Sequence, residues 1–303
     1  MEFYQLEAFV MVAALRSFSR AAEHLYLSQP TISSHVKALE KELDTPLFDR
    51  GKSELMLTQA GEILYRYARD MLDMRTNALK ELNSEKVKDE HLEIAASSVP
   101  CQYLLPETLT LFLQQYGPVN IRLYQKNSRT VCEEVFRYNY PLGVVGEKIK
   151  IPQLKYEPLV EDKMVVAIPQ LPAYADLLAK EELTLQDLAN YKLLLREEGS
   201  GTRSLLEQEL QQVGLSINSF QLQIFDNQET IKQAVRRGLG ITIISRLVVE
   251  DYLQFNMLAV RPLRNIQLKR NFYLVTHAKR IQTPAAKAFI TFIRTYFSSG
   301  GQQ

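Results

Sequence analysis

Short apolar strands alternate with amphipathic helices from residue 91 to residue 245, and this alternation is the strongest constraint on the fold. Because parallel strands need a crossover connection, the pattern predicts parallel sheets covered by helices on both faces. Over this length we expect two linked α/β lobes, with chain crossings near residues 162 and 266. Ligands in such folds bind at the carboxyl ends of the strands, in the cleft between the lobes. Strands are predicted over 92–96, 120–125, 142–146, 163–168, 191–195, 220–225 and 241–244, and helices over 104–115, 129–137, 173–180, 184–190, 202–214 and 229–237.

Residues 1–58 have a different, helical character. Apolar residues with helical spacing begin at Leu6, and Ser19 is the expected N-cap of a second short helix. A third helix ends before Pro46, because the residue before a proline avoids the α region. Residues 47–57 then read as strand, turn and strand. Three short helices followed by a hairpin are typical of a winged helix-turn-helix, an otherwise all-α unit whose second motif helix enters the DNA major groove.

The third helix starts with a proline, Pro30, which is tolerated in a first turn and follows the expected N-cap Ser28. Its apolar stripe, which includes Leu43, should face the core. The opposite face carries small and polar residues that can approach base edges: Gln29, Pro30, Thr31, Ser33, Ser34 and Lys37. A solvated helix would show the same face, and His35 beside it could equally pack or cap.

The individual side chains on this face offer distinct DNA contacts. Gln29 can read adenine, the Thr31 methyl can meet thymine, and Lys37 would bind a phosphate. Ser19 and Arg20 begin the preceding helix, whose N-terminus favours phosphate, although Ser19 could serve only as a cap. In the wing, Arg50 and Lys52 are candidates for contacts with the DNA backbone. They complete the set of candidate DNA-binding residues.

The charge distribution requires a local DNA-binding patch. Residues 1–90 hold 12 Lys or Arg and 15 Asp or Glu, which gives a net charge of −3. Residues 91–303 hold 24 and 20, which gives +4. Any DNA binding by the first segment must therefore depend on a few placed residues and not on its overall charge.

A single long helix is predicted over residues 59–85. Its apolar residues recur every three or four positions, at Leu64, Tyr67, Met71, Met74, Ala78 and Leu82. A narrow stripe on so long a helix favours pairing with a second copy. The alternative is an amphipathic helix that packs on its own domain.

Several classes of protein are disfavoured by what the sequence lacks. No apolar run approaches the roughly 18 residues of a membrane span. The two cysteines, Cys101 and Cys132, suit a reduced cytoplasm, where they could be redox sensors or buried small hydrophobes. Metal-ligand spacing and catalytic constellations are not found, so we expect no metal, no cofactor and no enzyme activity.

Several of these segments resemble those of the LysR-type transcriptional regulators. The resemblance rests on SFSRAA (17–22), LSQPTIS (27–33), LE (39–40), LFDR (47–50) and LTQAG (57–61), and further on PLGVVG (141–146), REEGSGTR (196–203) and IKQAVRRGLGI (231–241). It implies a dimeric or tetrameric DNA-binding protein with a periplasmic-binding-protein-like, two-lobed effector domain. The wing departs from the family pattern, because Glu54 and Met56 stand where many members carry basic residues.

Candidate effector ligands follow the strand ends of the C-terminal domain. Ser97 and Ser98 lie between the first strand and a helix, where hydroxyls and free N–H groups suit an anionic or polar ligand. The resemblance implies that the loops after other strands of this domain also line the effector cleft. For each of these polar residues, helix capping is the alternative to ligand binding. Arg196 and Arg203 could face the cleft or pair with nearby glutamates. The candidate effector-binding residues are Ser97, Ser98, Asn127, Ser128, Thr202, Asn227 and Gln228.

These observations give one main hypothesis and one alternative. The first is a cytoplasmic regulator of promoter DNA, controlled by a small polar or anionic metabolite, with no membrane association and with RNA polymerase as a further candidate partner. Its expected domains are 1–58, 59–88 and 89–303, the last divided into lobe I (89–162 and 267–303) and lobe II (163–266). The alternative is an enzyme or small-molecule carrier whose N-terminal unit serves only for oligomerisation.

Overall fold

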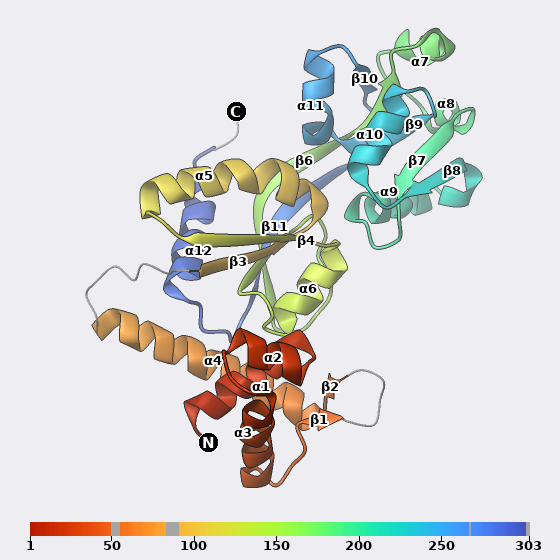
Figure 1. The fold of residues 1–303 in the computed structure, drawn as a ribbon. Helices are drawn as coiled ribbons and strands as arrows, with labels where there is room; N and C mark the ends of the chain where they lie inside the picture. Colours follow the sequence, from red (N-terminus) through yellow and green to blue (C-terminus); the bar gives the residue numbers. More distant parts are fainter. Residues whose placement is uncertain (50–54, 83–90, 267, 301–303) are drawn as a thin grey trace.

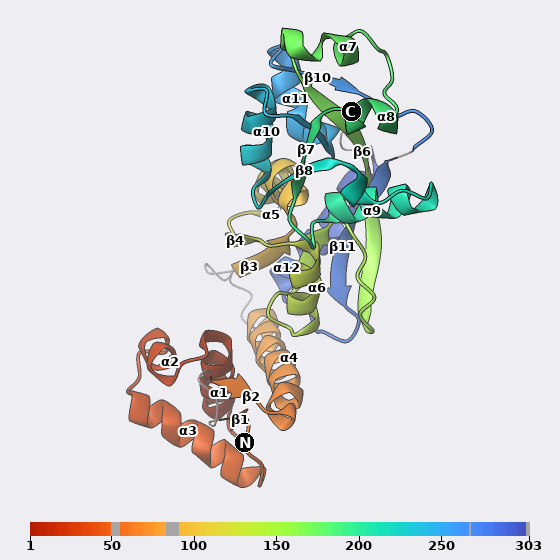
Figure 2. The ribbon, with the colours of Figure 1, turned by 90° about the vertical axis from the view of Figure 1, so that its right-hand side faces the viewer.

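The computed structural model describes residues 1–49, 55–82, 91–266 and 268–300, without the side chains of residues 77 and 80–82. A small helical unit lies at one end of the molecule and two α/β lobes follow it (Figures 1 and 2). The predicted overall class, α/β with an N-terminal winged helix-turn-helix, is confirmed. Among the described helices, none is both long enough and apolar enough to cross a membrane.

The N-terminal unit contains α1 (Phe3–Leu15), α2 (Phe18–His24) and α3 (Gln29–Glu42), followed by the paired strands β1 (Phe48–Asp49) and β2 (Met56–Leu57). Its core is built around the fully buried Phe9, whose ring meets those of Phe48 and Tyr65 edge-on. Two predictions here are wrong. Ser17, not Ser19, caps α2 by accepting from the Arg20 N–H, and Leu43 is 40% exposed because α3 ends at Glu42.

The start of α3 agrees with the sequence. Ser28 is the N-cap, and its hydroxyl accepts from the Thr31 N–H at 3.2 Å. Pro30 occupies the first turn, where its missing N–H leaves no hydrogen bond unmade. Ile32, Val36 and Leu39 are completely buried against the core of the unit. The helix therefore presents its polar face outward.

The long helix α4 (Gln59–Leu82) has two different faces. One face packs on the N-terminal unit, with Tyr65 and Ala68 buried and Leu64 and Leu72 partly buried. The other leaves large apolar side chains exposed: Ile63, Tyr67, Met71 and Met74. The predicted stripe mixed the two faces, because Leu64 faces its own domain. The side chain of Leu82 lies outside the described residues.

The two lobes are built on one mixed sheet. In lobe I, β3 (His91–Ala96), β4 (Asn120–Gln125) and β5 (Leu142–Val145) are parallel. In lobe II, β7 (Lys192–Arg196), β8 (Gln221–Phe225) and β9 (Ile241–Ser245) are also parallel. The long strands β6 (Leu154–Pro169) and β11 (Lys269–His277) join the lobes, and β10 (Leu258–Arg261) pairs with β6.

The prediction of purely parallel sheets is wrong for the joining strands. β6 pairs with β11 in antiparallel fashion along all of β11, and β6 is also antiparallel to β9. The reason is topological: β6 leads out of lobe I and β11 leads back, so the two strands run in opposite directions. The expected lobe boundaries at 162 and 267 stay predictions, and residue 267 lies outside the described residues.

Helices cover both faces of each half of the sheet (Figures 1 and 2). In lobe I, the π-helical turn η1 (Pro100–Leu104) leads into α5 (Leu105–Tyr116), which packs with α12 (Pro284–Ser298) against β3, while α6 (Ser128–Phe136) covers the other face. Lobe II carries the 3-10 turns η2 (Pro172–Tyr174) and η3 (Ile217–Ser219) and the helices α7 (Ala175–Leu178), α8 (Leu185–Ala189), α9 (Gly201–Gln212), α10 (Gln228–Arg236) and α11 (Arg246–Gln254).

A polar junction joins α4 to lobe I. Arg280, in the loop after β11, donates to the Tyr138 carbonyl at 2.7 Å and pairs with Asp73 of α4 at 3.4 Å. Asp70 accepts from the Ile281 N–H, and the Tyr65 hydroxyl donates to Asn139 at 3.0 Å. The long helix is therefore held against lobe I by hydrogen bonds from several positions.

His277 should make the protein less stable in mild acid. Burial, followed by the charges of Arg66, Arg280 and Lys279, lowers the pKa of His277 below its usual 6.5. Because the folded pKa lies below the unfolded one, this contribution is complete above about pH 6.5 and is lost as the pH falls. We expect the urea midpoint to fall between pH 7 and pH 5, and His277→Gln to flatten that fall.

The control for this prediction is the exposed His91, which should leave the pH profile unchanged when replaced by glutamine. In the folded protein His277 Nδ1 accepts from the Lys279 N–H, and Nε2 lies 3.1 Å from the Gln153 side-chain oxygen. A protonated ring cannot accept from Lys279. Equal pH profiles for wild type and His277→Gln would contradict the assignment.

Candidate DNA-binding face and interlobe site

The predicted DNA-binding residues of α2 and α3 lie together on one face. Gln29, Pro30, Ser34 and Lys37 are exposed, and Thr31 and Ser33 are half-exposed. Ser19 and Arg20 are exposed at the start of α2, and the Ser19 hydroxyl lies 3.4 Å from the Gln29 side-chain oxygen. Arg50 and Lys52 lie outside the described residues. Ser19 and Gln29 thus bring the start of α2 next to the start of α3.

Two acidic side chains of α3 have partners of their own. Glu40 accepts from the backbone N–H groups of Leu47 and Phe48, at the base of the wing. Glu42 pairs with the N-terminal ammonium group at 2.6 Å. Lys37 and Lys41 remain exposed. The negative charges of Glu40 and Glu42 are therefore partly offset by these contacts.

His35 packs rather than facing outward. Its ring lies 4.7 Å from the ring of Tyr4 in α1, and the buried Nδ1 has no hydrogen-bond partner in the described part of the chain. Of the two readings left open, the packing role is the one that the geometry supports.

Between the lobes, the ends of several strands meet at a small cavity of about 20 Å³. It brings together six of the seven predicted effector-binding residues, which lie far apart in the sequence. Asn227 is the exception, because it is exposed and caps α10 by accepting from the N–H groups of Glu229 and Thr230. The lining residues are Ser97, Ser98, Val99, Asn127, Ser128, Arg196, Ser200, Gly201, Thr202, Gln228 and Arg270.

The helices that point at the cavity are capped differently. Asn127 caps α6 by accepting from the Thr130 N–H at 2.8 Å, so its side-chain oxygen is already used. The N-cap of α9 is Ser200, whose side chain makes no capping hydrogen bond. The first N–H groups of α9 are thus left without a side-chain cap beside the cavity. Such groups favour negative charge.

Arg196 faces the cleft, whereas Arg203 does not. The Arg196 guanidinium donates to the Ser98 hydroxyl at 3.2 Å across the two lobes and to both oxygens of Glu197. Arg203 pairs with Glu207 and Glu198 of its own lobe. The sequence left both roles open for both residues.

Arg270 of β11 was missed by the sequence reasoning. Its Nε donates to the fully buried Asp162 of β6 at 2.9 Å, and Ser245 donates to the other Asp162 oxygen at 2.6 Å. Burial raises the pKa of Asp162, while Arg270 and Ser245 oppose that rise. A Cβ added at Gly201 would lie 3.3 Å from Arg270 Nη1, so the guanidinium reaches the start of α9. Arg270 stands between Lys269 and Asn271 at the polar start of β11, so no local signal distinguished it.

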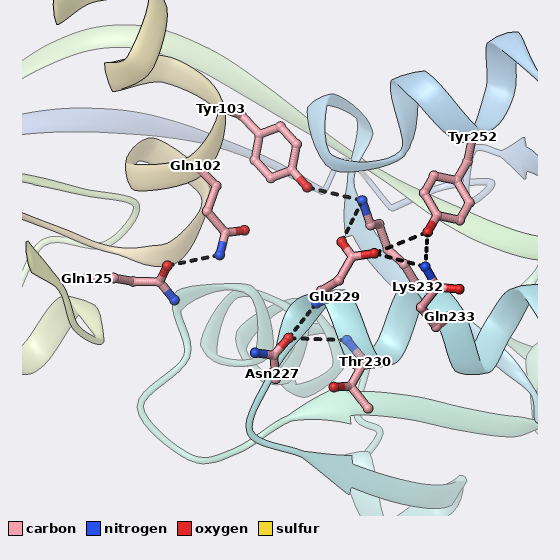
Figure 3. Close-up of polar contacts among 9 residues, drawn as sticks. All are labelled: Gln102, Tyr103, Gln125, Asn227, Glu229, Thr230, Lys232, Gln233 and Tyr252. Atoms are coloured by element: carbon pink, nitrogen blue, oxygen red, sulfur yellow. Dashed lines mark hydrogen bonds and ion pairs between the residues drawn. The ribbon is translucent and has the colours of Figure 1, made fainter. Parts of the chain in front are cut away.

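A second contact between the lobes lies beside the cavity (Figure 3). Lys232 of α10 pairs with Glu229 at 2.8 Å and with the Tyr103 hydroxyl of lobe I at 3.2 Å. Its ammonium group also lies over the rings of Tyr103 and Tyr252. Burial opposes ionisation, but the bonds to Glu229 and Tyr103 raise the pKa of Lys232 overall. Lys232 is therefore a charged residue whose partners are already in place.

The cysteines do not have the environment of reactive thiols. Cys132 is buried and accepts from the Tyr156 hydroxyl at 3.3 Å, and Cys101 is half-buried. Burial raises the pKa of both thiols, which lowers the fraction of reactive thiolate. In the described part of the chain, no cluster of three or more His, Cys, Asp or Glu side chains could hold a metal ion.

Comparison with known proteins decides the family. The model of the bacterial regulatory helix-turn-helix protein, lysR family, matches residues 3–62, and that of the LysR substrate binding domain matches residues 86–298. The chain belongs to the LysR family of transcriptional regulators. It is 32% identical to the HTH-type transcriptional regulator CysL of Bacillus subtilis (strain 168) over 296 residues, which cover 97% of both chains.

Solved structures of LysR regulators share the fold. Full-length OxyR from Pseudomonas aeruginosa superposes with a TM-score of 0.77 at 22% identity, over 97% of this chain and 95% of that one. Full-length CbnR complexed with its target DNA superposes with a TM-score of 0.60 at 20% identity, over 97% and 99%. LysR regulators bind promoter DNA and small-molecule effectors, and they form oligomers. This LysR chain is accordingly a regulator and not an enzyme.

Proposed function

We propose that this LysR regulator reads an interrupted inverted repeat through two copies of α3, under the control of a small polar or anionic metabolite bound between lobes I and II. The observation that carries the DNA-binding half is the outward face of α3. Its small polar side chains permit close approach to base edges, and the carboxylates of Glu40 and Glu42 have partners of their own. CbnR, which has the same fold, is known in complex with its target DNA.

The effector half of the proposal rests on the interlobe cavity. Ser97, Ser98 and Ser128 supply hydroxyls from lobe I, and Thr202 and Gln228 face them from lobe II. Because the lining residues come from both lobes, a ligand there would contact both and bias their relative position. Asn227 would support the site indirectly, since its side chain caps α10, which begins at Gln228.

Pairing through α4 completes the proposal. Two recognition helices related by a twofold axis require a dimer, and the exposed apolar face of α4 offers a surface for it. A dimer or a tetramer satisfies this requirement. RNA polymerase is the further partner that we propose for a promoter-bound regulator. The proposed divisions are 1–58 for DNA binding, 59–88 for pairing and 89–303 for the effector.

Lys37→Ala and Gln29→Ala should weaken DNA binding in different ways. Loss of a phosphate contact weakens binding to every sequence and reduces the salt slope by about one for each recognition helix. Loss of a base contact relaxes preference at one base position, by about 1–3 kcal/mol. Gel-shift titrations with DNA from upstream of its own gene, with single-base variants and at several salt concentrations, measure both effects.

Two outcomes of these titrations would count against the proposal. Equal losses by Gln29→Ala on specific and random DNA would remove Gln29 from base reading. No retardation by the wild-type protein at low salt, with or without metabolites, would contradict sequence-specific binding. Lys287→Ala, in α12 and far from α3, is the matched loss of charge and should change neither affinity nor salt slope.

A further inference from the structure

We infer that the interlobe site recognises an oxyanion group (sulfate, phosphate or carboxylate) through Arg270, the Gln228 amide and the start of α9. This inference rests on the proposed effector site and narrows its ligand class. It begins with Gln228, which is 7% exposed, lines the cavity and has a buried side-chain Nε2 without a partner in the described chain. An unpaired buried donor is costly, so an acceptor from outside the chain is expected there.

The other free groups around the cavity are donors as well. Arg270 uses Nε for Asp162, and its Nη1 lies beside Gly146 and Gly201. The first N–H groups of α9 follow Ser200, whose side chain does not cap them. A guanidinium and an amide carry only donors at these atoms. The complementary ligand is therefore rich in acceptors.

Charge favours an anion over a neutral acceptor. In the described chain the cavity is lined by two arginines, Arg196 and Arg270, and by no carboxylate. Three carboxylates lie nearby and each has partners: Glu197 binds Arg196 through both oxygens, Asp162 binds Ser245 and Arg270, and Glu147, beside Gly201, is hydrogen-bonded to Ser204 and lies near Arg270. Charge-assisted hydrogen bonds to an oxyanion are about twice as strong as neutral ones.

Lys232 is not the anion partner, although it is the other buried cation nearby. Its ammonium group is already held by Glu229, by the Tyr103 hydroxyl and by two aromatic rings (Figure 3). Lys232 also does not line the cavity. Arg270 and Gln228 therefore set the specificity of the site.

The size of the cavity limits the group that it accepts. About 20 Å³ is room for roughly one water, so a compact head group must part the lobes slightly on entry. The Arg196–Ser98 bond is the contact across the cavity that entry would break. An anion would then receive the guanidinium hydrogen bonds that Ser98 gives up.

Gln228→Glu tests the inference without removing any existing contact, because the side-chain Nε2 has no partner to lose. The substitution keeps the shape of the side chain and replaces its donor by a negative oxygen. Arg270 is unsuitable as the first target, since its loss would leave Asp162 buried without its ion pair. Gln211→Glu, exposed in the last turn of α9, adds the same charge in the same lobe as a control.

Isothermal titration of the full chain with sodium sulfate, phosphate and acetate at constant ionic strength gives the measurement. We expect saturable binding of at least one anion, at least tenfold weaker in Gln228→Glu and unchanged in Gln211→Glu. The three salts distinguish tetrahedral from planar head groups. Absence of saturable binding by all three, or equal binding by wild type and Gln228→Glu, would overturn the inference.

Gel shifts on the same preparations separate this inference from the proposed function. If wild type retards its promoter DNA and binds none of the anions, the oxyanion inference fails and DNA binding stands. If a neutral polar metabolite binds and Gln228→Glu does not weaken it, an effector between the lobes stands and its oxyanion character fails. If DNA is not retarded and anions still bind through Gln228, the proposed DNA reading fails alone.

Discussion

Replacing Tyr67 and Met74 with glutamate should turn the oligomer into monomers and reduce affinity for promoter DNA at least 100-fold. Both side chains lie on the exposed face of α4, at 59% and 54% exposure, with Ile63 and Met71 on the same stripe. Four charges placed in a paired-helix interface would repel one another and lose apolar burial. Loss of the dimer removes the second half-site, and bivalent binding of this kind contributes 10²–10⁴-fold.

Sedimentation analysis of the mass, together with gel shifts, would test this expectation. Thr76→Glu is the matched control, because it lies two residues beyond Met74 on the same helix and is an exposed polar position. It should remain oligomeric and retain DNA affinity. If the double variant keeps its mass in solution, the paired surface lies elsewhere and the apolar face of α4 needs another explanation.

Arg280→Met should destabilise the protein by about 3–5 kcal/mol, the range for breaking a buried ion pair. The Arg280 side chain is 2% exposed, and burial lowers its pKa to about 10. Removal leaves the Tyr138 carbonyl without its donor and Asp73 without its cation, at the point where α4 meets lobe I. The urea midpoint should therefore move to a lower concentration.

Arg294→Met provides the comparison, since Arg294 forms an exposed pair with Glu157. Such surface pairs contribute about 0–1 kcal/mol. Equal effects of the two substitutions would show that the buried junction contributes no more than a surface pair. A large effect confined to Arg280 would identify the junction as a stabilising contact between the linker helix and lobe I.

Local patterns in the sequence predicted much of the fold because the physical causes are local. Ser28 and Pro30 define the start of α3 through capping and proline geometry, and both agree with the structure. The strand–helix alternation predicted both lobes. Errors occurred where two neighbours compete for one role: Ser17 and Ser19 are both good caps, and only the packing of α2 distinguishes them.

The candidate site was predictable to the extent that it follows strand ends. Ser97, Ser128 and Thr202 could be found because each follows a strand that ends at the cleft. Arg270 could not, since it lies within β11 and reaches the site only through antiparallel pairing with β6. The sequence also could not distinguish the roles of Asn227 and Gln228. The exact residue at which α10 begins decides which side chain caps the helix and which is buried.

The antiparallel pairing of β6 with β11 has a mechanical consequence. Lobe I is joined to α4 by hydrogen bonds at Arg280, Asp70 and Asn139, and we expect it to move with that helix. Lobe II is connected to lobe I by the hydrogen-bonded strands β6 and β11. Because the two strands are paired, a hinge movement of lobe II would bend them together. Arg270 and Asp162 are paired across these two strands, so a ligand bound by the guanidinium would contact the connection between the lobes directly.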